Sequence, residues 1–246
     1  MKQLTSLVKI EYLFGKRNWA VFIMGVGMPV AFFLFFSGMY QFDSEEIKIR
    51  AVKQMLISMT AFSSISFGLF SLPFSFIEDK TSNWALRLRH TPVPIGYYYL
   101  ARFIRMIVNM MVAIMMVFAV GAGIRGISMN ISEWFGAFWL LVVGSACFLA
   151  IGFVLTLITS TEVLSVASNV LYLGLAMLGG MWIPVDLFPE WMQQIAKLTP
   201  TYHLVNLANT YAQKQEFSVE SFLVLLSYAI ISVVVTLVVK KRLEVN

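Results

Sequence analysis

Charge is scarce in this sequence: Asp, Glu, Lys and Arg make up 13% of the 246 residues, whereas 59% are hydrophobic. A soluble domain of this length could not bury that much apolar surface, so the composition indicates a protein whose solvent is lipid. The net charge of +5 is modest, and most basic residues lie beside apolar runs. We interpret them as signals of orientation in a membrane, which argues against binding to nucleic acid.

Cysteine and histidine are almost absent as well. The single cysteine, Cys147, lies inside an apolar segment and supports neither a disulfide nor a metal site, so we expect it to contribute only packing. The two histidines, His90 and His203, fall on opposite sides of the membrane in the topology derived below and cannot share one metal ion. The sequence therefore predicts no bound metal.

The motifs of catalysis and of nucleotide binding are also missing. The sequence contains no HExxH and no GxSxG, which disfavours an intramembrane enzyme. The glycine-rich stretch 121–126 lacks the GK[ST] of a P-loop, so the chain cannot bind ATP in that manner. If this protein is a pump, its ATP must be hydrolysed by another polypeptide.

Long hydrophobic runs, by contrast, are abundant. A hydrocarbon core of roughly 30 Å requires about 20 apolar residues per helix. Aromatic residues suited to the headgroup zone lie at the ends of several runs. We therefore predict an all-α integral membrane protein with six transmembrane helices, at residues 19–40, 54–77, 98–123, 134–159, 163–181 and 221–239.

Six spans place both termini on one side, and the basic residues indicate which side. With a cytoplasmic N-terminus, the inner segments carry twelve of the 18 Lys and Arg residues and the outer segments carry six. The inner residues cluster at the ends of spans, where the positive-inside bias counts most. We therefore predict cytoplasmic termini, with the connection 78–96 inside and the segment 182–208 outside.

Ionisable residues are missing from the middles of the predicted spans. Transporters driven by proton or sodium gradients usually bury such groups there, because the coupling ion needs a ligand. The polar residues at that depth are Ser, Thr and Asn, and each can form hydrogen bonds that join neighbouring helices. Asn169, in the middle of the fifth span, is the best candidate for a further role.

Two inner segments have amphipathic features. Residues 3–17 place Leu4 and Leu7 near helical spacing beside basic residues, which predicts a short interfacial helix. In the connection 78–96, Trp84 and Leu88 are four positions apart and form an apolar ridge on a helix of about three turns. That second helix either lies passively on lipid headgroups or inserts into a cytoplasmic protein, and its own residues leave both possibilities open.

The stretch 181–200, MWIPVDLFPEWMQQIAKLTP, is too polar to span a bilayer and too apolar for a solvated loop. We expect Pro184 to end the fifth span. Pro189 can occupy the first turn of a new short helix, where its missing N–H costs nothing. Pro200 stops that helix before a second apolar half, and the polar stretch 209–216 follows.

Two regions of the sequence resemble the ABC-2-type exporter permeases. Residues 79–94, DKTSNWALRLRHTPVP, resemble the loop between the second and third spans of that family, most of all in the branch of daunorubicin-resistance membrane subunits. Asn83 stands where that branch has glycine, and both residues tolerate a left-handed turn. The motifs GGMWIP at 179–184, LFPEW at 187–191 and LTPTYH at 198–203 are also similar to the family.

The resemblance covers nearly the whole chain and implies one permease domain over residues 1–246, with a cytoplasmic coupling helix between spans two and three. The residues that it implies for coupling to an ATPase are Glu78, Asp79, Lys80, Trp84, Arg87, Leu88 and Arg89. It also implies that residues 182–208 form a re-entrant hairpin, which closes the outer end of a pathway. The implied gate residues are Pro184, Phe188, Pro189, Trp191 and Ile195. We expect Trp191 and Ile195 to pack against the outer ends of the spans.

The function implied by the resemblance is that of a membrane subunit in an ATP-driven exporter. Its cargo would be hydrophobic or amphiphilic (a drug, a peptide antibiotic or a lipid), as in multidrug export and antibiotic resistance at the plasma membrane of a bacterium. The implied partners are a cytoplasmic ABC ATPase that binds ATP and magnesium, a second copy of this chain or a homologous permease, and membrane lipid. The chain itself would bind no cofactor.

Cargo would pass between apolar and aromatic side chains of the second and fifth spans. The candidate pathway residues are Phe62, Phe67, Phe70, Asn169 and Tyr172. An aromatic stripe of this kind is more often helix packing. The alternative from another functional class is a membrane sensor or assembly subunit, in which the cytoplasmic helix transmits a signal without transport.

Overall fold

The computed structural model describes residues 2–17, 19–39, 44–82, 87, 90 and 94–245. The regular elements within these ranges are all helices, which confirms the predicted all-α class. In chain order they are α1 (Lys2–Arg17), α2 (Trp19–Met39), α3 (Glu45–Ser66), the π-helix η1 (Phe67–Ser71), α4 (Leu72–Thr81), α6 (Ile95–Arg125), α7 (Ile131–Leu155), α8 (Thr161–Leu178), the 3-10 helix η2 (Val185–Leu187), α9 (Glu190–Ala196), α10 (Pro200–Lys214) and α11 (Val219–Val245).

Six helical stretches in the described ranges are long and apolar enough to cross a membrane, which confirms the predicted number of spans. Five of them are α2, α6, α7, α8 and α11. The sixth is one continuous rod of 35 residues, Glu45–Asp79, which comprises α3, η1 and most of α4. At 1.5 Å per residue this rod is about 50 Å long, so it extends beyond a hydrocarbon core of roughly 30 Å.

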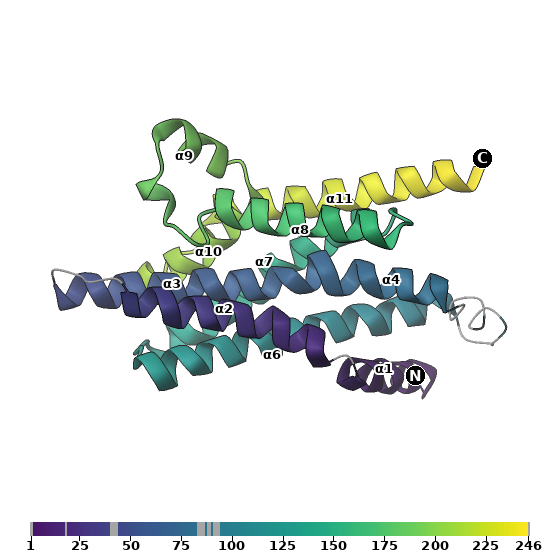
Figure 1. Ribbon diagram of the computed structural model, residues 1–246, viewed down its shortest axis with the longest axis horizontal. Helices are drawn as coiled ribbons and strands as arrows, with labels where there is room; N and C mark the ends of the chain where they lie inside the picture. Colours follow the sequence, from purple (N-terminus) through teal and green to yellow (C-terminus); the bar gives the residue numbers. More distant parts are fainter. Residues whose placement is uncertain are drawn as a thin grey trace.

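The spans run along the long axis of the molecule (Figure 1). Both chain termini lie at the same end of the bundle as the end of α4 and the start of α6, whereas α9 lies toward the opposite end (Figure 1). This arrangement agrees with a topology in which the connection 78–96 shares a side with both termini. That this side is the cytoplasm stays a prediction.

The α3–η1–α4 rod is the most buried of the six spans. Two of its serine hydroxyls contact the neighbouring helices. Ser63 Oγ donates to the carbonyl of Gly25 on α2 at 2.8 Å, and the hydroxyls of Ser64 on α3 and Ser145 on α7 lie 2.6 Å apart. Contacts of this kind contribute roughly 1 kcal/mol each within a membrane. The prediction that serines at this depth join the helices is therefore confirmed for both residues of the rod.

The rod and α7 approach each other at backbone distance where glycine faces glycine. A Cβ atom at Gly152 would lie 2.0 Å from the carbonyl oxygen of Gly68, and a Cβ atom at Gly68 would lie 2.5 Å from the backbone of Phe148. No rotation of a side chain could make room, because the obstructing atoms belong to the backbone. Glycine at both positions therefore allows η1 to pack directly on α7.

The six-span arrangement can be tested with single cysteines in a Cys147→Ser background. We expect a membrane-impermeant thiol reagent to label Gln193→Cys on intact cells and to leave Ser82→Cys unlabelled, because the predicted topology places Gln193 outside the cell and Ser82 inside it. Permeabilised cells provide the control that Ser82→Cys is reactive. Equal labelling of both positions on intact cells would contradict the topology.

Candidate functional site

The segment expected to dock an ATPase joins α4 to α6. The predicted docking residues outside the described part of the chain are Trp84, Leu88 and Arg89, together with the side chain of Lys80. The helix predicted for this segment therefore stays a prediction. Among the described residues, Glu78 and Arg87 are exposed, and Arg87 Nη2 donates to the carbonyl of Ser82 at 3.0 Å. Both side chains are thus available to a partner at the surface.

Asp79 has a different place, because its carboxylate faces the interior of the protein. Only 8% of the residue is exposed. The carboxylate accepts hydrogen bonds from the Tyr98 hydroxyl and from both terminal nitrogens of the Arg102 guanidinium, with 3.2 Å between Asp79 Oδ1 and Arg102 Nη2. Asp79 therefore anchors the end of α4 to α6 and is not exposed for direct contact with an ATPase.

Arg102 lies at the centre of a buried ionic cluster. Its Nη1 donates to the carbonyl of Ser75 on α4 at 2.8 Å, and its Nη2 donates to Glu11 Oε1 on α1 at 3.1 Å. The other carboxylate oxygen of Glu11 lies 2.9 Å from Arg105 Nε. The members of this group, named the Arg102 cluster from here on, are Glu11, Asp79, Arg102 and Arg105. Its two carboxylates and two guanidinium groups balance each other and join α1, α4 and α6.

Three members of the Arg102 cluster are absent from the site predicted by sequence. In the sequence-based prediction, Arg102 and Arg105 are used only in the count of basic residues that predicts the cytoplasmic side. Glu11 carries a signal that could have identified it, since it lies four positions after Leu7 and seven after Leu4 on the apolar face of an amphipathic helix. A carboxylate on a buried face needs a partner, because an unpaired buried charge is strongly unfavourable.

The helix predicted over residues 3–17 is present as α1. Leu7 and Glu11 face α6, where Leu7 packs with Tyr98 and Ala101, and the opposite side of α1 exposes Tyr12. The helix thus packs on the start of α6 with one face and exposes side chains of its other face. Its contact with lipid headgroups stays a prediction.

The structure brings three of the five predicted pathway residues together. The ring of Phe62 on α3 stacks on that of Tyr172 on α8 with centroids 4.4 Å apart, and Phe70 meets Tyr172 edge-on at 5.2 Å. The Tyr172 hydroxyl donates to the carbonyl of Phe62 at 3.1 Å. Phe67 belongs elsewhere, because its ring packs against Phe22 of α2 at 5.8 Å. Within one chain, this aromatic group holds α3 and α8 together.

Asn169 is separated from the aromatic group and lies on the exposed side of α8. Its Nδ2 donates to the carbonyl of Ser165 at 2.9 Å within the same helix. The exposed residues around it include Val166, Val170 and Leu173, so the amide interrupts an otherwise apolar face. Its polar atoms are therefore directed away from the core of this chain.

The outer hairpin differs in two details from the prediction. The fifth span ends at Leu178, before Pro184, because Gly179 caps α8 and Gly180 adopts a left-handed φ of 73°. Glycine tolerates this conformation at little cost, so it ends the helix earlier than proline would. Pro189 lies at the N-cap of α9, one residue before its first turn.

Three of the five predicted gate residues, Pro189, Trp191 and Ile195, are exposed in the single chain. Trp191 is 64% exposed and Ile195 is 41% exposed, so the expectation that they pack against the outer ends of the spans is not met within one chain. The backbone of Phe188 is held within the hairpin, because its carbonyl accepts a hydrogen bond from Gln193 Nε2 at 2.8 Å. The apolar side of α9 thus remains available to a surface outside this chain.

The second half of the hairpin, α10, is fastened to the spans. Thr201 Oγ1 donates to the carbonyl of Leu175 on α8 at 2.7 Å. His203 Nε2 lies 2.8 Å from the carbonyl oxygen of Lys197, and its Nδ1 lies 3.2 Å from Ser221 Oγ on α11. The helix runs on to Lys214, so the stretch 209–216 expected to be a polar end is mostly helical.

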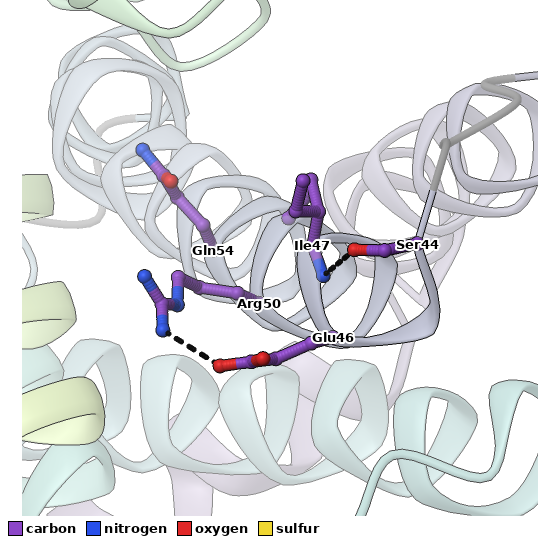
Figure 2. Close-up of a pocket in the computed structure, with 6 residues that line it drawn as sticks. Ser44, Glu46, Ile47, Arg50 and Gln54 are labelled. Carbon is purple, nitrogen blue, oxygen red and sulfur yellow. Dashed lines mark hydrogen bonds and ion pairs between the residues drawn. The ribbon is translucent and has the colours of Figure 1, made fainter.

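A hollow at the first turns of α3 has a volume of about 460 Å³. Figure 2 shows the Ser44 hydroxyl capping the Ile47 amide and the carboxylate of Glu46 directed toward Arg50. The Glu46–Arg50 side chains are 86% and 68% exposed, so this ion pair contributes only about 0–1 kcal/mol. Nothing in the hollow is both charged and buried, and we assign it no function.

Comparison with known proteins agrees with this architecture. The family described as ABC-2 type transporter matches residues 2–211. The chain is also 28% identical over 228 residues to the protein named "Putative transport permease YvfS" in Bacillus subtilis (strain 168), and the match covers 93% of each chain. The six spans and the extent of the family match lead to one conclusion. This chain belongs to the ABC-2 type transporter family and is a membrane transport protein.

Proposed function

We propose that this chain is the membrane subunit of an ATP-driven exporter and that a separate ABC ATPase docks on the connection between α4 and α6. The family match, together with the lack of a P-loop in the sequence, supports an energy source on another polypeptide. The observation that carries the proposal is the Arg102 cluster, which fastens the chain just before and just after residues 83–93. A segment held firmly at both ends can transmit force to the spans.

Movement of the docking segment would reach the middle of the protein through the rod. α4 continues through η1 into α3, where Phe62 contacts Tyr172 of α8. ATP binds better to a closed pair of ATPases, and a stiff connection would transfer that preference to the conformation of the spans. The ATP and its magnesium ion are held by the partner, and this chain supplies the moving parts.

Two permease subunits would face each other across a two-fold axis. Asn169 supports this arrangement, because an amide facing hydrocarbon would leave polar atoms without hydrogen-bond partners. A facing subunit, either a second copy or a homologous permease, would cover the exposed side of α8. It would also enclose a pathway between the two α8 helices.

The cargo that suits this pathway is hydrophobic or amphiphilic. Valine and leucine side chains on α8 offer apolar contacts, and Asn169 offers a hydrogen-bonding group. Drugs, peptide antibiotics and lipids share these properties, so we propose a role in multidrug export and antibiotic resistance. The proposed location is the plasma membrane of a bacterium with both termini in the cytoplasm, and the Bacillus subtilis relative supports a bacterial source.

The docking proposal is tested by comparing Trp84→Ala with Arg89→Ala. A buried aromatic anchor is worth about 2 kcal/mol or more, whereas an exposed ion pair contributes about 0–1 kcal/mol. We therefore expect Trp84→Ala to lose more of the ATPase in a pull-down from detergent. Only Arg89→Ala should weaken binding in the way that added salt weakens the parent complex.

A tryptophan on the outer side provides the matched control for this pull-down. Trp191→Ala removes the same side chain from the hairpin and should leave the amount of bound ATPase unchanged. If Trp84→Ala binds the ATPase as well as the parent does, the docking role of this segment is wrong.

The gate proposal concerns the same Trp191 side chain. Because it is 64% exposed in one chain, it is available to pack against the second subunit at the outer end of the pathway. We expect Trp191→Ala to raise the passive leak of ethidium, an amphiphilic fluorescent cation, from proteoliposomes that contain the complex. Loss of subunit assembly, without any leak from the complexes that do form, would identify the residue as a folding element and not a gate.

A further inference from the structure

The Arg102 cluster does more than anchor the docking segment, because it also includes a residue of α1. Glu11 is 2% exposed and lies between the two arginines of α6, with its Oε1 3.1 Å from Arg102 Nη2 and its Oε2 2.9 Å from Arg105 Nε. Arg102 is 4% exposed and contacts Glu11 and Asp79 with the same nitrogen, Nη2. One side chain thus joins α1 to the end of α4.

Stability alone does not account for buried charges at this place. Desolvation of a buried ion costs several kcal/mol, and well-packed apolar side chains of similar size are often as stable as a buried ion pair or more stable. Ion pairs with hydrogen bonds fix the relative positions of the groups that they join, whereas apolar contacts do not. The planar guanidinium of Arg102 accepts only certain positions of the Asp79 and Glu11 carboxylates.

The connection from α1 onward is short. α1 ends at Arg17 and α2 begins at Trp19, so one residue separates the cluster-bearing helix from the first span. The first span also contacts the rod, since Phe22 packs against Phe67. A displacement of α1 would therefore pull on α2 through the short stretch of main chain that joins them.

We propose that Glu11 is a positioning residue that couples α1, and through it the first span, to the docking segment. When the ATPase moves the docking segment, Asp79 at the end of α4 moves with it and displaces Arg102. The Glu11 carboxylate follows the guanidinium, so that α1 and α2 move together with α4 and α6. This inference rests on the proposed function, because it adds a second route for force from the same ATPase.

Neutralising Glu11 and Arg105 together distinguishes a coupling role of Glu11 from a contribution to folding. Glu11→Gln alone leaves the buried Arg102 and the half-buried Arg105 with one carboxylate, and we expect it to lower the yield of folded protein. Glu11→Gln with Arg105→Gln restores the balance of charge and should restore the yield and the bound ATPase. The control is Lys53→Gln with Glu133→Gln, which neutralises the ion pair of 2.6 Å between α3 and α7 at the other end of the bundle.

The readout is the rate at which an impermeant maleimide labels Met39→Cys at the end of α2, in a Cys147→Ser background. The complex with its ATPase is compared without nucleotide and with ATP trapped by vanadate. We expect the parent and the Lys53/Glu133 control to label at different rates in the two states. The Glu11/Arg105 double variant should lose that difference while it still hydrolyses ATP.

Retention of the full nucleotide-dependent difference in the Glu11/Arg105 double variant would overturn the inference. So would a parent complex that hydrolyses ATP but labels Met39→Cys at one rate in both states, although the proposed function would then still stand. If no ATPase binds the parent chain, the proposed function fails and the inference fails with it.

Discussion

The guanidinium group of Arg102, buried between the carboxylates of Glu11 and Asp79, determines how the end of the bundle that carries both termini is built (Figure 1). Each of these charges would be costly to bury alone, and removal of one partner from such a group typically costs about 3–5 kcal/mol. The three helices that carry them therefore cannot separate without exposing or isolating a charge. The connection between α4 and α6 is the proposed docking place of an ATPase. The Arg102 cluster holds the helices on both sides of this connection.

The remainder of the molecule connects the Arg102 cluster to the opposite end of the bundle. The rod from Glu45 to Asp79 crosses the bundle without a break, and its π-helical part packs on the backbone of α7 at Gly152. Because η1 and α7 touch through their backbones, no side chain between them can adjust, so a shift of η1 would also displace α7. α7 in turn contacts α11 and α10, the second half of the hairpin. A continuous set of contacts thus leads from the Arg102 cluster to the opposite end of the bundle.

The spans could be predicted from sequence because the length of an apolar run decides whether a helix crosses a membrane. The end of α8 was harder to place, since two glycines end it before Pro184 is reached. Pairing across long distances could not be predicted, as Arg102 meets Glu11 91 positions away. Exposure of Trp191 depends on which surface covers the hairpin, and one sequence does not contain that information. The docking residues Trp84 and Leu88 were predicted from their shared helical face and stay a prediction.

The central claim is that an ATPase acts on this chain through the segment between α4 and α6. A structure of the complex by cryo-electron microscopy, with nucleotide trapped in the ATPase, tests it most directly. We expect Trp84 to be buried in a cleft of the ATPase, with the contacts of Arg102 to Asp79 and Glu11 retained. An ATPase bound to another part of the chain, with residues 83–93 free of contact, would contradict it.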